Sequence, residues 1–185
     1  TAAISYSWMS ELYSRAPYVS DRDRVQLDAE GSIQYGMYYW DDNYPDSHVF
    51  AEGECLRKTF DPDFMLYHTM AVDEWGHMKG ADSAEYANAV AAVGHLIAAR
   101  MPEWLEKGYQ VVVTADHGMN NLGIHVGTEY AQREVALYIF SDKVENGRFE
   151  ENYISQLNVA PLVCKLMGVP ATEGMKQELE IVFSK

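Results

Sequence analysis

Short apolar runs with strand character alternate along this chain with longer stretches of helical periodicity, and this alternation limits the folds that the chain can adopt. The clearest run is residues 109–115, where β-branched side chains follow Gly108 without a charged interruption. Consecutive apolar positions of this kind are typical of a strand buried on both faces. We therefore predict an α/β fold with a mostly parallel sheet and helices on both faces, and we expect residues 109–115 to form a central strand.

Weaker patterns of the same two kinds predict the remaining elements, which are strands over residues 63–70 and 135–140 and helices over residues 46–58 and 153–167. A further helix is predicted to begin at Asp82, with Glu85 completing a capping box, and to end or kink before Pro102. The polar, aromatic stretch 34–46 has no clear period, and we expect a loop there.

The net charge of the chain argues against some classes of binding partner. The chain has 185 residues, of which 14 are Lys or Arg and 28 are Asp or Glu, so its formal charge is -14. Such a field repels nucleic acid polymers and anionic membranes, and no apolar run is long enough to span a bilayer. An anionic substrate such as a phosphate ester would need a local positive charge, for which a bound metal ion is the natural source. The compartment stays open, with the cytoplasm favoured.

Two predicted loops that follow strands contain metal-ligand residue types. In the first loop, residues 71–77, Asp73 and His77 lie four positions apart, and Gly76 permits a turn that folds them onto one cation. In the second, Asp116 and His117 follow the 109–115 strand, and His125 comes eight positions later. Loops at the ends of parallel strands converge, so these five side chains predict a nitrogen and oxygen ligand set suited to zinc or manganese.

The alternative for any single Asp–His pair is a solvated loop, which is the more common case. Five such residues in two loops favour a metal centre over that alternative. The aromatic side chains of the 34–46 stretch can stack a nucleobase or pack against the domain, and packing is the more common outcome for Tyr35, Tyr38, Tyr39, Trp40 and Tyr44.

The motifs resemble those of the alkaline phosphatase superfamily, most closely its type I phosphodiesterase/nucleotide pyrophosphatase branch. The resemblance is carried by Asp73-x-x-Gly76-His77, by Thr114-Ala115-Asp116-His117-Gly118-Met119, and by His125 ahead of Arg133-Glu134-Val135-Ala136-Leu137. Residues 159–170 are similar to the family's terminal helix, so the resemblance covers most of the chain. The chain has Val126 where the family usually has the first Gly of His-Gly-Gly, and Ala136 where relatives tend to have Pro.

The resemblance implies a fold similar to alkaline phosphatase and two divalent ions that clamp a phosphorus centre, zinc being preferred and manganese the alternative. It implies that Asp73, His77 and His125 bind one ion, and that Asp116 and His117 bind the other. In the family the second ion is completed by an upstream Asp and by the Ser or Thr nucleophile, and neither has a counterpart here. We therefore interpret residues 1–185 as one α/β domain, incomplete at its N-terminal side, that forms the C-terminal portion of a larger catalytic domain.

The function implied by the resemblance is hydrolysis of phosphodiester or pyrophosphate bonds, as in nucleotides. The substrate would be a small phosphate ester, and a preceding segment of the same protein would supply the nucleophile. The isolated chain is then expected to be weakly active or inactive. The alternatives are a phosphomutase, a phosphonate hydrolase, or a non-catalytic domain with a structural ion, which would be closed by four protein ligands.

Overall fold

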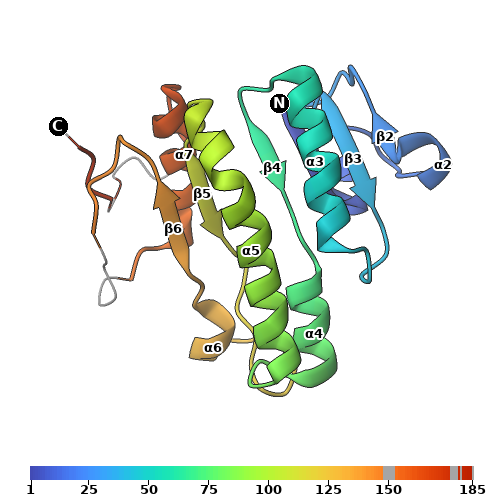
Figure 1. Cartoon of the computed structure of the whole chain (residues 1–185), viewed down its shortest axis with the longest axis vertical. Helices are drawn as coiled ribbons and strands as arrows, with labels where there is room; N and C mark the ends of the chain where they lie inside the picture. The colour runs from blue at the N-terminus through green and yellow to red at the C-terminus, as the bar shows by residue number, and fades with distance from the viewer. Residues whose placement is uncertain (148–152, 176–178, 180, 185) are drawn as a thin grey trace. The chain divides into compact units, whose positions relative to one another are not determined.

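Two separately packed units make up the structure, a computed structural model that describes residues 1–147, 153–175, 179 and 181–184 (Figure 1). The first unit contains residues 1–99 and 117–134, and the second contains residues 100–116 and 135–185. The boundary falls inside helix α5, Ala84–Glu106. In the described part of the chain, no helix combines the length and the apolar character that crossing a bilayer requires.

The first unit is built on a four-stranded sheet in the order β2-β3-β1-β4. Its strands are β1 (Ala2–Tyr6), β2 (Val25–Gln26), β3 (Tyr35–Tyr39) and β4 (Met65–Tyr67). Strand β1 pairs in parallel with both β3 and β4, which places Ile4 opposite Met37 on one side and Tyr67 on the other. Only β2 runs antiparallel to its neighbour. The predicted mostly parallel sheet is therefore confirmed in this unit.

Five shorter helices accompany this sheet: α1 (Ser7–Tyr13), α2 (Ser20–Asp23), α3 (Asp46–Phe60), α4 (Ala71–Lys79) and α6 (Tyr130–Arg133). Ile4 and Tyr39 form a buried cluster with Val49 of α3 on one face of the sheet. Side chains alternate between the faces of a strand, so Tyr38 lies on the opposite face, and helix α1 also packs against β3. The expected helices on both faces are thus present.

The expectation of a loop over residues 34–46 is wrong for residues 35–39, which form strand β3. The ring of Tyr38 folds back over Gly36, where a Cβ atom would collide with it. Tyr38 and Tyr39 are both almost fully buried, so the aromatic residues act as strand-forming core side chains. Packing was the more common outcome expected for these aromatic residues, and it applies to this pair.

The second unit contains a two-stranded antiparallel sheet of β5 (Val111–Thr114) and β6 (Leu137–Phe140), with Val112 opposite Ile139. The prediction that residues 109–115 form a central strand buried on both faces is wrong for the described residues, because β5 pairs with β6 alone and its side chains are only partly buried. An apolar run specifies a strand but carries no information about the strand beside it.

Helix boundaries differ from the sequence prediction in three places. Helix α5 is capped by Ser83 rather than by Asp82, because the Ser83 hydroxyl accepts a hydrogen bond from Tyr86 N at 3.1 Å. The helix also continues through Pro102, and Trp104 just beyond it is buried. The helix predicted over residues 153–167 is shorter, with a 3-10 turn, η1 (Gln156–Asn158), ahead of α7 (Val159–Met167).

Candidate metal centre

Helix α4 positions the first pair of predicted ligands. The expected loop over residues 71–77 is wrong, since Asp73 and His77 lie on this helix, which follows β4 after three residues. Residues four apart share one face of an α-helix, and His77 Nε2 lies 3.4 Å from Asp73 Oδ2. The sequence spacing therefore brings the pair together through helical geometry rather than through a turn.

Gly76 allows a close approach and does not form the expected turn. A Cβ atom there would lie 2.8 Å from Met119 Cε and 3.2 Å from the ring of Tyr86. Gly123, which has a positive φ of 74°, approaches α4 from the other segment, and a Cβ atom there would lie 2.7 Å from the His77 carbonyl oxygen. Both glycines therefore let the segment after β5 lie directly against α4.

This contact orients His77 as a ligand. His77 Nδ1 lies 2.8 Å from the Gly123 carbonyl oxygen, which can only accept a hydrogen bond, so we assign the proton to Nδ1. The Nε2 lone pair is then available to a metal ion, as in histidine ligands held by a backbone carbonyl. The His125 ring stands edge-on to the His77 ring at 5.0 Å, so the long loop returns a second imidazole to the helix.

Asp73, His77 and His125 each offer one ligand atom, and the three atoms lie within 4.8 Å of one another. Asp73 Oδ1 is buried and accepts no hydrogen bond from any residue that the structure describes. A buried carboxylate oxygen without a donor is costly unless a cation neutralises it. The donor set and this unsatisfied oxygen fit a divalent ion bound by nitrogen and oxygen ligands.

His117 lies beside the three residues. Its ring stacks on the His125 ring at 3.9 Å, and its Nε2 is 3.9 Å from Asp73 Oδ1. Asp116 belongs to the second unit, where its carbonyl oxygen accepts a hydrogen bond from Gln156 Nε2 at 3.0 Å. The structure therefore brings four of the five predicted ligands together, and the role of Asp116 stays a prediction.

Asp46 supports the centre and was not found by sequence reasoning. It is the first residue of α3, yet its Oδ1 accepts hydrogen bonds from Met70 N at 3.3 Å and Ala71 N at 3.4 Å, at the start of α4. Burial raises the pKa of Asp46 above its ordinary value, while these two hydrogen bonds oppose the shift. Its position at the start of a predicted helix was the only signal available, and that signal does not show that it caps a different helix.

Tyr86 borders the centre on the side of α5. Its pKa is raised, chiefly by burial and secondly by the negative charge of Asp73.

Val126, the departure from His-Gly-Gly, is 75% exposed, so the larger side chain is accommodated without disturbing His125.

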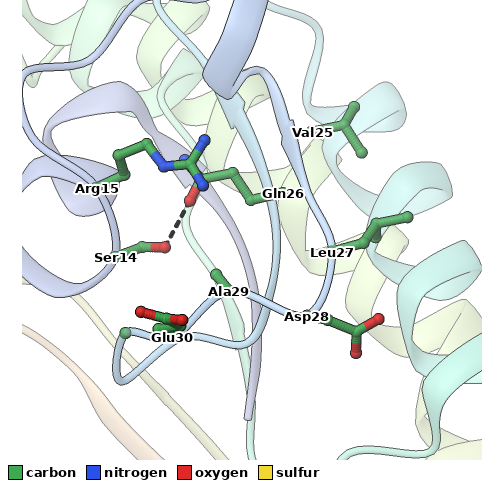
Figure 2. Close-up of a pocket in the computed structure, with 9 residues that line it drawn as sticks. Ser14, Arg15, Val25, Gln26, Leu27, Asp28, Ala29 and Glu30 are labelled. Carbon is green, nitrogen blue, oxygen red and sulfur yellow. Dashed lines mark hydrogen bonds between the residues drawn. The ribbon is translucent and has the colours of Figure 1, made fainter.

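A polar hollow of about 520 Å³ elsewhere in the first unit contains none of the predicted ligands (Figure 2). It lies between the end of α1 and the residues around β2, and Ser14 donates a hydrogen bond to Gln26 Oε1 across it. Arg15 lines it but pairs with the buried carboxylate of Asp23 at 3.3 Å. Arg22 pairs with the same carboxylate at 2.6 Å, and the hollow forms no part of the candidate metal centre.

Known proteins with similar sequences are phosphoester-transferring enzymes by name. The catalytic subunit of GPI ethanolamine phosphate transferase 3 from Mus musculus is 27% identical over 157 residues, which cover 80% of this chain and 14% of that protein. The Homo sapiens protein of the same name is 29% identical over 115 residues, which cover 60% of this chain and 10% of that protein. GPI ethanolamine phosphate transferase 2 from Schizosaccharomyces pombe is 24% identical over 132 residues, which cover 60% of this chain and 17% of that protein.

The chain thus spans 10–17% of the length of these relatives. No solved structure matched it. Residues 4–161 match the family described as type I phosphodiesterase / nucleotide pyrophosphatase, which is the branch that the motifs resemble. The chain belongs to the type I phosphodiesterase / nucleotide pyrophosphatase family.

Proposed function

We propose that this chain supplies the metal-binding part of an active site that cleaves phosphodiester bonds. One observation carries the proposal: Asp73, His77 and His125 place three ligand atoms within 4.8 Å of one another, and Oδ1 of this Asp73 is a buried oxygen that no described residue satisfies. Zinc is the preferred ion, and manganese is the alternative. When bound, such an ion neutralises charge at the phosphorus centre and lowers the pKa of an attacking oxygen.

The residues of the chain have separate roles in this proposal. The Gly123 carbonyl holds the His77 ring so that Nε2 faces Asp73, and the stacked ring of His117 restrains His125. Asp116 and His117 would bind the second ion together with an upstream Asp and a Ser or Thr nucleophile. The position of His117 beside Asp73 supports two neighbouring ions, because one carboxylate lies close to ligands assigned to both.

The acceptor of the phosphoryl group separates two candidate reactions. In both, the upstream hydroxyl oxygen would attack phosphorus and displace the leaving group, an alcohol from a phosphodiester or a phosphate from a pyrophosphate, and a second oxygen would later displace the enzyme oxygen. The family name supports water as the second acceptor, which gives hydrolysis of a small phosphodiester or pyrophosphate. The names of the relatives support an alcohol acceptor and transfer of ethanolamine phosphate, and this is the second candidate.

The alternatives from the sequence differ in ways that can be measured. A structural ion should have four protein ligands, whereas the group of Asp73, His77 and His125 leaves a coordination position open. A phosphomutase or phosphonate hydrolase would share these ligands and differ in its products.

The proposal is tested in the full-length protein that contains this chain, after removal of metal with a chelator. Turnover of bis(p-nitrophenyl) phosphate should return with zinc or manganese, and His125→Ala should abolish it. The matched control is His95→Ala, which removes an exposed imidazole from α5. Product analysis with and without added ethanolamine-type alcohols separates hydrolysis from transfer.

The same assay on residues 1–185 alone should give little or no turnover, because the nucleophile is expected upstream. Full metal-dependent turnover by the isolated chain would contradict the fragment interpretation. Activity in the full-length protein that survives both chelation and His125→Ala would contradict the metal centre itself.

A further inference from the structure

A network of hydrogen bonds around two buried amide side chains holds the loop that returns His125 to the candidate metal centre. Asn120 and Gln132 are only 7% and 5% exposed, although both side chains are polar. Burial of an amide group is costly unless its donors and acceptors are paired. Neither side chain belongs to the group of three metal ligands, and the proposed function leaves both without a role.

The Asn120 side chain closes the turn that leads to His125. Its Oδ1 accepts hydrogen bonds from Leu122 N at 3.0 Å and from Ile124 N at 2.9 Å. Its Nδ2 donates to Glu129 Oε2 at 3.0 Å, so the partners on the two sides fix the orientation of the amide. One side chain thus joins the segment before His125 to the segment after it.

The backbone of Ile124, the residue before His125, is held at both its N–H and its carbonyl group. The carbonyl oxygen accepts hydrogen bonds from Asn120 N at 3.1 Å and from Gln132 Nε2 at 3.2 Å. The Gln132 side chain is fixed in turn, because its Oε1 accepts a hydrogen bond from Glu129 N at 3.1 Å. These contacts restrict the backbone from which the His125 imidazole extends.

The same network holds the carbonyl group that orients His77. Gly123 N donates a hydrogen bond to the Asn120 carbonyl oxygen at 3.1 Å, and the Gly123 carbonyl oxygen lies 2.8 Å from His77 Nδ1. The Asn120 carbonyl also accepts a hydrogen bond from Ala81 N at 3.1 Å, just beyond the end of α4. The orientation of both histidine ligands therefore depends on Asn120, for one through Ile124 and for the other through Gly123.

We propose that Asn120 is a positioning residue of the metal centre and that Gln132 and Glu129 support it. The inference rests on the proposed function, and it adds residues that bind neither metal nor substrate but hold His77 and His125 in the geometry of ligands. Groups that hold histidine ligands in this way fix the orientation and the tautomer of the ring, and their loss lowers metal affinity by about 10- to 100-fold.

An exchange of donor and acceptor tests the proposal by calorimetric titration of this chain with zinc. Asn120→Asp keeps an acceptor for the loop N–H groups but sets a second carboxylate against Glu129, and zinc affinity should fall by about 10- to 100-fold. Glu129→Gln alone should have little effect, because its amide oxygen still accepts from Asn120. Asn120→Asp combined with Glu129→Gln restores one donor and one acceptor between the two side chains, and should recover most of the affinity.

The matched control is Asn121→Asp, which introduces the same charge at the adjacent, exposed position and should leave zinc affinity unchanged. If circular dichroism shows that Asn120→Asp is unfolded, Gln132→Met takes its place. It removes the side-chain donor to the Ile124 carbonyl, and zinc affinity should fall by about tenfold. Unchanged affinity in that folded variant would overturn the proposal.

A measurement without metal distinguishes positioning of the ligands from general support of the fold. Nitrogen-15 NMR at about pH 8 should place the His77 proton on Nδ1 in the unmodified chain, because that nitrogen faces the Gly123 carbonyl. Asn120→Asp should weaken this tautomer preference, and the added Glu129→Gln should restore it. The signals of His95, an exposed residue of α5, should be the same in all variants.

Equal zinc affinity and an unchanged His77 tautomer in Asn120→Asp would overturn the positioning role and leave the proposed function standing. A loss of affinity that Glu129→Gln does not recover would also overturn it. Absence of zinc binding in the unmodified chain would be the failure of the proposed function. In that case the His77 tautomer decides the positioning role, since Asn120→Asp should still alter it and an unchanged tautomer would refute it.

Discussion

The two halves of the candidate metal centre are positioned by different kinds of structure. Asp73 and His77 lie one helical turn apart on α4, so local backbone geometry alone brings them together. His117 and His125 lie on an irregular segment that depends on contacts with a distant part of the chain, including the close approach of Gly123 to His77. The helical pair should therefore keep its metal-binding geometry after local substitutions, whereas the loop pair should lose that geometry when a single long-range contact is removed.

The loop half is tested by Gly123→Ala, which should weaken zinc binding strongly. The φ of 74° disfavours any side chain, and the added Cβ atom would lie 2.7 Å from a backbone oxygen that cannot move without disturbing α4. We expect zinc affinity to fall about 100-fold, as for loss of a residue that orients a ligand. Calorimetric titration measures this change.

The control for that substitution is Gly94→Ala on α5, where no atom lies within 4 Å of the new Cβ atom. It should leave zinc affinity unchanged and stabilise the helix by about 0.5–1 kcal/mol. Equal zinc affinity in the two variants would show that the loop half does not depend on the Gly123 contact.

The helical half is tested by Asp73→Asn. Zinc binding should be lost, because an amide oxygen is a poor substitute for the carboxylate. Without metal, the free energy of unfolding of this variant should equal or exceed that of the unmodified chain by up to about 1 kcal/mol, since the variant removes a partly buried charge whose Oδ1 no described residue satisfies. Chemical denaturation with and without zinc measures both effects, and Glu74→Gln, on the same turn, is the control.

Asp73→Asn could instead lower the free energy of unfolding by the same amount without zinc as with zinc. The unsatisfied oxygen would then have a structural role. The inference that it faces a cation would then be wrong.

A smaller effect is expected from the cap of α4. Asp46→Ala removes both hydrogen bonds to the first turn and should lower the free energy of unfolding by about 1 kcal/mol. Because burial raises the pKa of Asp46, its contribution is complete at low pH and is lost as pH rises through the folded-state pKa. Denaturation between pH 3 and 7 should show this decline in the unmodified chain and not in Asp46→Asn. A net contribution of the Asp46 carboxyl to stability that rose with pH would contradict this account.

The smallest effect is expected from Val126→Gly, which restores the family's His-Gly-Gly pattern. Val126 is 75% exposed, so zinc affinity should stay within about twofold and stability within about 0.5 kcal/mol. A large gain in affinity would show that Val126 holds His125 away from its best position. The measurement is the same calorimetric titration.

The sequence predicted those features that depend on nearby residues. The spacing of Asp73 and His77 was enough to bring the pair together, even though the expected loop is a helix, because a separation of four suits both geometries. The helix predicted over residues 46–58 is present as α3, which ends only two residues later, since its periodicity and its starting Asp are local signals.

Features that depend on distant residues could not be read from the sequence in the same way. The β-branched run of β5 specified a strand, but its antiparallel partner β6 lies more than twenty residues away. The capping of α4 by Asp46 joins positions 24 and 25 residues apart. The close approach at Gly76 involves Met119, and no sequence pattern distinguishes such a glycine from one in a turn.

Zinc binding to this chain is the most direct test of the central claim that Asp73, His77 and His125 form a metal site. Calorimetric titration with elemental analysis should give one tightly bound ion per chain, and both His77→Ala and His125→Ala should abolish it. His95→Ala should bind zinc like the unmodified chain, because that exposed imidazole lies on α5, outside the ligand group. Absence of specific binding, or binding that survives both substitutions, would contradict the account.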